Sequence, residues 1–215
     1  MHENAIFLAS SCSQLWQGSS QLNVKDPFPN VQPLKKIRTS DCKELQSSTS
    51  NAVVALAVET AMAGFGALVF CSGRQNSQNM AELISSAMPL DNVSDEILLR
   101  RHDVISDLRS LSVGLDEVLE KTVLRGVAFH RWLSTASIQR CTNAYADAGL
   151  TCEERDIVAE SYDKGVLRVI VATCSLAAGI NLPARRVILQ GVRMGKDLVG
   201  PALLYLSTRR IPFYR

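Results

Sequence analysis

Residues 166–190 read VLRVIVATCSLAAGINLPARRVILQ, and the fold class follows mainly from this stretch. It starts with an apolar run at 166–172 that only Arg168 interrupts, and this length and composition predict a buried strand. A turn rich in small and polar residues follows, and the apolar run at 186–190 predicts a second strand. Apolar runs without alternation are typical of strands that are covered on both faces, as in a parallel sheet.

The same order of elements occurs upstream of this stretch. Residues 67–71 form another continuous apolar run, and residues 126–130 predict a short strand. Helices are predicted from apolar periodicity and end signals at 52–63, 75–87, 94–111, 115–124 and 151–164. Because helices separate the strands, hairpins are excluded, and we expect an α/β domain with a mostly parallel sheet.

The two ends of the chain differ in composition from its body. Residues 1–50 contain nine serines and three prolines and keep no helical or alternating pattern, so we expect a linker or a poorly ordered extension there. The folded domain is expected at 51–205, and residues 206–215 form a divergent tail.

Composition excludes several classes of protein. The 215 residues are 47% hydrophobic and 20% charged, which suits a chain with a packed core. No apolar stretch approaches the roughly 18–20 residues that a membrane span needs, so no membrane partner is expected. The six cysteines include no C-x-x-C pair, so no metal site is predicted. Residues 185–215 hold seven Lys or Arg and one acidic residue, which fits either a polyanionic partner or a solvated end.

Polar or glycine-rich turns follow three predicted strands, at 72–74, from His130 onward, and at 173–183. Ligands of parallel sheets bind beyond the carboxyl ends of the strands, where hydroxyls and backbone N–H groups can hold phosphate. Each hydroxyl is equally suited to capping a helix. The chain has no G-x-x-x-x-G-K-[ST], D-E-x-H or D-E-x-D sequence, so it is not expected to hydrolyse ATP by itself.

Three segments resemble motifs of superfamily-two helicases. ALVFCSGR at 67–74 resembles motif IV, AGLTCEERDIV at 148–158 resembles the segment H-H-A-G-L-T-x-E-E-R, and residues 168–188 resemble motif V. The motif V match is long and specific for Ski-like DNA helicases, the group that contains the helicase domain of DNA polymerase theta and HELQ. The resemblance covers about residues 52–204 and corresponds to the second RecA-like lobe alone.

This resemblance implies a three-layer RecA-like domain from a two-lobed motor that binds single-stranded DNA, with ATP and Mg²⁺ in the complete enzyme. Neither ATP nor Mg²⁺ is expected to bind tightly to this chain alone. By motif, four residues would contact the DNA backbone and two would face the nucleotide. The first four are Ser72, Arg74, Thr173 and Ser175, and the other two are Gly179 and Asn181.

The residue types suit these roles, although some also suit others. Small hydroxyls fit a strand held by its phosphates, and Gly179 allows close approach of the backbone. The alternative for Asn181 is a turn residue before Leu182-Pro183. Arg185 and Arg186 are either DNA contacts or ion-paired residues at the start of a strand.

The chain departs from the family pattern in three places. The first lobe, with its P-loop and DExH box, has no counterpart in these residues. Residues at about 131–147 stand between His130 and Ala148, where the family has none, and are either a surface loop or wrongly retained coding sequence. Residues 205–215 occupy the place of motif VI, Q-M-x-G-R-A-G-R, which carries the arginine finger.

We therefore expect a fragment of an ATP-dependent DNA helicase, from a truncated or wrongly delimited gene, that is inactive alone. A first lobe is its expected partner, and the resemblance implies DNA repair in the nucleus. The alternative is a non-catalytic module that binds single-stranded nucleic acid or a partner lobe. A third alternative is a nucleotide-binding α/β enzyme of another kind. It has no support, because the sequence contains no glycine-rich fingerprint.

Overall fold

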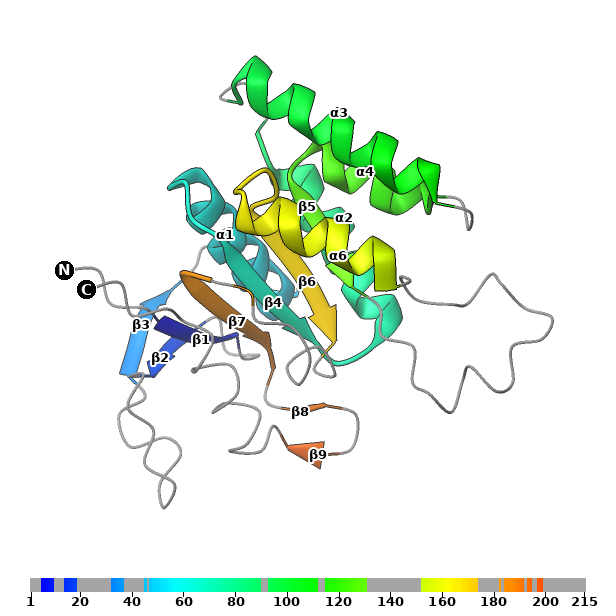
Figure 1. Cartoon of the computed structure of the whole chain (residues 1–215). Coiled ribbons are helices and arrows are strands. Elements are labelled where there is room, and N and C mark those ends of the chain that lie inside the picture. Colours follow the sequence, from blue (N-terminus) through cyan, green and yellow to red (C-terminus); the bar gives the residue numbers. More distant parts are fainter. Residues whose placement is uncertain are drawn as a thin grey trace.

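The structure is a computed structural model that describes residues 5–9, 14–18, 32–36, 45, 47–89, 93–111, 115–130, 152–173, 182, 184–191, 193–194 and 197–198. Its strands form a seven-stranded sheet in the order β3-β2-β1-β7-β4-β6-β5, and a small sheet of β8 and β9 (Figure 1). The strands are β1 (Ala5–Ala9), β2 (Gln14–Gly18), β3 (Gln32–Lys36), β4 (Ala67–Cys71), β5 (Val127–His130), β6 (Val169–Thr173), β7 (Arg186–Gln190), β8 (Arg193–Met194) and β9 (Asp197–Leu198).

The part of the sheet formed by β7, β4, β6 and β5 is entirely parallel. All five residues of β4 are buried, and so are the first four of β6, because helices cover both faces of these strands. Apolar runs without alternation therefore predicted these strands correctly, and the expected α/β class with a mostly parallel sheet is confirmed.

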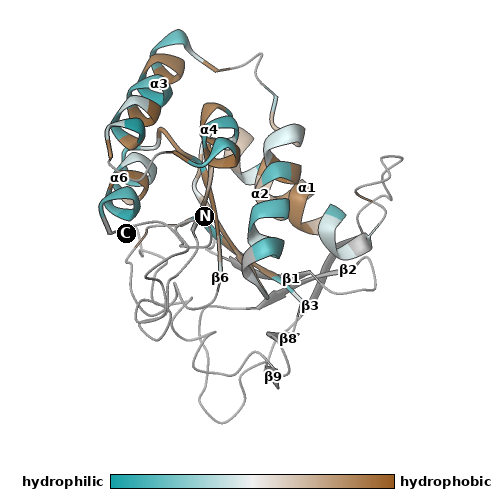
Figure 2. Cartoon of the chain, turned by 90° about the vertical axis from the view of Figure 1, so that its right-hand side faces the viewer, coloured by the Kyte–Doolittle hydropathy of each residue, from teal (hydrophilic) through white to brown (hydrophobic). Residues whose placement is uncertain are grey.

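Helices form the two outer layers of the domain. Figure 2 shows α1 (Ser48–Met62) and α2 (Arg74–Ala87) on one side of β6, and α3 (Asp95–Ser110) and α6 (Cys152–Asp163) on the other. The remaining described helix, α4 (Glu117–Leu124), contacts β5, α2 and α3. At Gly66, just before β4, a β-carbon would collide with the ring of Tyr162 from α6, so this close packing requires glycine. The domain is thus three-layered, as the resemblance implied.

Three strands lie within the 1–50 extension, where the sequence pattern predicted none. β1 pairs in parallel with β7, while β2 and β3 add antiparallel strands beyond it. Short runs separated by serine and proline have too little periodicity to reveal such pairing, which depends on the partner strand. The insertion at 131–147 and the tail at 206–215 lie outside the described residues.

Arg101 is a buried cation within α3 that joins this helix to two other segments. It is 3% exposed, and its Nε and Nη1 donate to the carbonyl oxygens of Val166 and Leu124 at 3.2 and 3.0 Å. Gly126 lies against the guanidinium with a φ of +78°, so both its backbone conformation and the lack of space require glycine. Burial, and the charge of Arg168, lower the pKa of Arg101.

Replacing Arg101 by methionine should lower the free energy of unfolding by about 2–4 kcal/mol, because two carbonyls lose their donor in a buried site. Urea denaturation followed by circular dichroism measures this change. The matched control is Arg100→Met, because Arg100 is 51% exposed and pairs with Glu96 at 2.7 Å on the helix surface. We expect the control to change stability by less than about 0.5 kcal/mol, and equal losses in both variants would contradict the role of Arg101.

Candidate nucleic-acid interface

The carboxyl ends of β4, β6 and β7 meet at one edge of the sheet, toward which their arrowheads point in Figure 1. Cys71 at the end of β4 is the register partner of Thr173 at the end of β6. Ser72 follows directly and is exposed, while Thr173 is half-buried. The parallel register therefore brings one expected DNA contact from each motif to the same edge.

The other expected site residues are less fully described. Arg74 begins α2, and the structure describes its backbone but not its side chain. Ser175, Gly179 and Asn181 lie outside the described residues, so their roles remain expectations from the resemblance.

The hydroxyl of Ser72 does not cap helix α2. The N-cap residue is Gly73, which has an extended backbone, and no side chain caps the helix there. Ser77, which is fully buried, turns its hydroxyl back to donate to the carbonyl oxygen of Gly73 at 3.0 Å. The capping alternative therefore does not apply to Ser72.

Two residues that the sequence did not single out complete this edge. The Nδ2 of Asn76 donates to Ser72 Oγ at 3.3 Å and to Gln190 Oε1 at 2.9 Å. Gln190 is the last residue of β7, and Asn76 lies one helical turn after Ser72. A signal for Gln190 was available, because a polar residue that ends an apolar strand lies at the same edge as the other strand ends.

The edge is built for hydrogen bonding rather than for covalent or metal chemistry. Burial raises the pKa of the Cys71 thiol to about 12, although a hydrogen bond with Ser77 acts in the opposite direction. The thiol is therefore protonated and unreactive at neutral pH. Among the described residues, no group of three His, Cys, Asp or Glu could hold a metal ion. None of the helices in the described part is long and apolar enough to cross a membrane.

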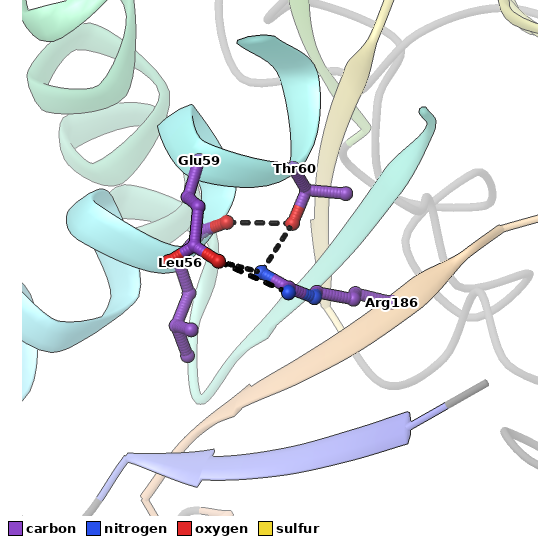
Figure 3. Close-up of polar contacts among 4 residues, drawn as sticks. All are labelled: Leu56, Glu59, Thr60 and Arg186. Atoms are coloured by element: carbon purple, nitrogen blue, oxygen red, sulfur yellow. Dashed lines mark hydrogen bonds and ion pairs between the residues drawn. The ribbon is translucent and has the colours of Figure 1, made fainter. Parts of the chain in front are cut away.

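Arg186 belongs to the opposite, amino edge of the sheet. Its Nη1 and Nη2 bind Glu59 Oε1 at 3.0 and 3.1 Å, and Nη1 also donates to Thr60 Oγ1 at 3.3 Å (Figure 3). The hydroxyl of Thr60 in turn donates a hydrogen bond to the carbonyl oxygen of Leu56 at 2.6 Å. Arg186 thereby ties α1 to the start of β7, which supports the ion-paired alternative for this residue.

Arg185 contacts an aromatic ring at the same amino edge. Its guanidinium carbon lies 5.2 Å from the centre of the Phe65 ring, a cation–π distance. Because β7 starts at Arg186, both arginines are a full strand length away from Ser72 and Thr173. The two arginines therefore do not extend the polar surface at the carboxyl edge.

Known proteins resemble this chain over about two thirds of its length. It is 31% identical over 185 residues to DNA polymerase theta of Drosophila melanogaster, and 35% identical over 152 residues to the POLQ-like helicase of Homo sapiens. It is also 34% identical over 154 residues to the ATP-dependent DNA helicase Hel308 of Pyrobaculum calidifontis. This chain is a homologue of the Ski-like DNA helicases. The resemblance seen in the motifs is therefore confirmed.

The homology to Ski-like helicases concerns only a part of each relative. The matches cover 72%, 68% and 71% of this chain, but 8%, 12% and 19% of polymerase theta, the POLQ-like helicase and Hel308. A scan against protein-family models gives no match. The parallel α/β fold agrees with one RecA-like lobe of a Ski-like helicase.

The amino-edge assignment predicts that Arg186→Gln weakens folding but not DNA binding. Loss of the link between α1 and β7 should cost about 0.5–1.5 kcal/mol of unfolding free energy, because Arg186 is partly buried and donates to both Glu59 and Thr60. The control is Arg109→Gln, which removes the same charge from an exposed pair with Glu120. Affinity for single-stranded DNA, measured by fluorescence anisotropy, should be equal in the two variants. A selective loss of affinity in Arg186→Gln would identify Arg186 as a DNA contact instead.

Proposed function

We propose that this chain is the second RecA-like lobe of an ATP-dependent DNA helicase, and that it holds single-stranded DNA at the carboxyl edge of its parallel sheet. The main support is the register of Cys71 with Thr173, which brings the end of motif IV next to the first part of motif V. The exposure of Ser72 and its freedom from a capping role add to this support. Hydroxyl groups at such an edge suit phosphates, which are acceptors only.

The proposed DNA contacts are the four residues that the resemblance names. Ser72 and Thr173 would donate hydroxyl protons to successive phosphates, Arg74 would supply a charge, and Ser175 would extend the line along motif V. This arrangement would grip the sugar–phosphate backbone and leave the bases unread, as a motor that moves along any sequence requires.

ATP and Mg²⁺ belong to the complete helicase in this proposal. Gly179 and Asn181 would face the nucleotide, while the P-loop and the acidic box of a first lobe would hold its phosphates and the metal ion. The relative from Pyrobaculum calidifontis is named as an ATP-dependent DNA helicase, which supports ATP as the fuel. Both nucleotide-facing residues lie outside the described part, so no chemical step is derived through the nucleotide.

The cellular setting is also part of the proposal. Similarity to DNA polymerase theta and to the POLQ-like helicase supports work on DNA in the nucleus, and repair is the role we infer. The second candidate function is a non-catalytic module that binds single strands or a partner lobe. It is favoured by the lack of P-loop and DExH sequences in these 215 residues.

We expect the chain to bind single-stranded DNA with an affinity that falls as salt rises. Fluorescence anisotropy with a labelled oligonucleotide of about 20 nucleotides, at about 50 and 200 mM salt, measures this. Ser72→Ala and Thr173→Val should each weaken binding by about fivefold, since each removes one hydrogen bond. The control is Ser86→Ala, because Ser86 lies near the far end of α2 and its hydroxyl donates to the carbonyl oxygen of Glu82 at 2.9 Å. Absence of binding at low salt would contradict the proposal.

We also expect the purified chain to show no DNA-stimulated ATPase. With ATP, Mg²⁺ and single-stranded DNA present, phosphate release should equal that of a Thr173→Val, Gly179→Ala double variant. The physical reason is that no sequence in the chain builds a phosphate-binding loop. Release clearly above the double variant would mean that these residues carry a catalytic site of a kind not recognised from their motifs.

A further inference from the structure

We propose that Asn76 is a positioning residue that fixes the direction of two hydrogen-bond donors, Ser72 and Gln190, toward the phosphates of a bound single strand. This inference rests on the proposed function and deepens it. Neither Asn76 nor Gln190 belongs to the residues that the helicase motifs assign to DNA. The inference starts from the amide of Asn76, whose nitrogen bridges the turn after β4 and the end of β7.

A primary amide nitrogen carries two protons, and Asn76 uses them in two directions. One goes to Ser72 Oγ at 3.3 Å and the other to Gln190 Oε1 at 2.9 Å. Gln190 is 114 positions away in the sequence, so the bond joins the helix after the motif IV turn to the last residue of β7, the strand in which motif V ends. Both protons of the amide are thereby committed within the protein.

The hydrogen bond from Asn76 to Ser72 determines the direction of the Ser72 hydroxyl proton. A serine oxygen accepts through its lone pairs and donates through one proton. Because Asn76 supplies the donor to this oxygen, the proton of Ser72 is directed away from Asn76 and toward solvent, where the side chain is exposed. An exposed, directed O–H is suited to a phosphate oxygen, which only accepts.

The bond to Gln190 has the same effect on a second side chain. Its Oε1 accepts from Asn76, so the two protons on its Nε2 are directed the other way. Gln190 is half-buried at the end of β7, and this burial restricts the alternative rotamers of its side chain. The result is a pair of neutral donors at one edge, held by an amide that need not touch the ligand.

Neutral hydrogen-bond donors change the affinity for DNA without changing how steeply it depends on salt. They add affinity through hydrogen bonds, whereas the steepness of the salt dependence is set by the number of charge contacts. If Asn76 acts through Ser72 and Gln190, reversing its bonding should cost affinity beyond any effect of charge. A purely structural tie between α2 and β7 would instead change stability and leave the donors' coupling to DNA unaltered.

The decisive variant is Asn76→Asp, compared with Asn79→Asp. Aspartate is acceptor-only, so it would draw the protons of Ser72 and Gln190 inward and away from DNA. Asn79 lies one turn further along α2, is exposed and accepts from Gln75 at 3.0 Å, so its variant carries the same charge change. Anisotropy titrations with the full chain at about 50 and 200 mM salt should show Asn76→Asp binding about tenfold more weakly than Asn79→Asp, with parallel salt dependences.

A double-mutant cycle makes the test independent of how well Asn76→Asp folds. Ser72→Ala, Asn76→Ala and their combination are titrated with the same oligonucleotide, with urea midpoints measured for each. We expect the double variant to lose clearly less affinity than the product of the two single losses, since Asn76 acts partly through Ser72.

The results of these experiments distinguish a failure of the positioning role of Asn76 from a failure of the proposed function. Equal affinities for Asn76→Asp and Asn79→Asp, or multiplicative losses in the cycle, would overturn the positioning role while DNA binding by the unaltered chain stands. If the unaltered chain binds no single-stranded DNA, the proposed function fails and the inference fails with it.

Discussion

The arrangement of this domain depends on the parallel pairing of strand β4 on both sides, with β6 and with β7. The strand is buried along its whole length, so its backbone groups must be satisfied by these two neighbours, and its side chains by the helices above and below. Parallel pairing makes the three strands end at the same edge. At that edge the chain turns polar, and the polar residues that follow the strands of motifs IV and V come together there.

Charged anchors hold the helices around this sheet without occupying the carboxyl edge. Arg186 ties α1 to the start of β7, and Arg101 joins α3 to the end of α4 and to the turn before β6. These guanidinium groups satisfy carbonyl and carboxylate oxygens inside the fold. At the carboxyl edge the structure describes the neutral hydroxyl and amide groups of Ser72, Asn76 and Gln190, next to Arg74 at the start of α2. Neutral donors at this edge suit the proposed binding of single-stranded DNA, because its phosphates accept hydrogen bonds.

Homology to Ski-like helicases supports the proposal that this edge binds DNA. Hel308 of Pyrobaculum calidifontis, named as an ATP-dependent DNA helicase, shares 34% of aligned residues with this chain. In a two-lobed motor, a second lobe must grip a strand firmly enough to move it and loosely enough to release it. Hydrogen bonds from neutral groups are individually weak, and their direction can be set by a residue that the strand never touches.

The family, the α/β class and the strands at 67–71 and 186–190 were predictable from the amino-acid sequence, because buried parallel strands are unbroken apolar runs. The sequence also pointed to Ser72 and Thr173, since polar turns after such strands share one edge. The folded arrangement was needed to show that β1 pairs with β7, that Arg186 binds Glu59 at the amino edge, and that Asn76 joins Ser72 to Gln190. These contacts link residues far apart along the chain, so they depend on strand order and register, which no local pattern encodes.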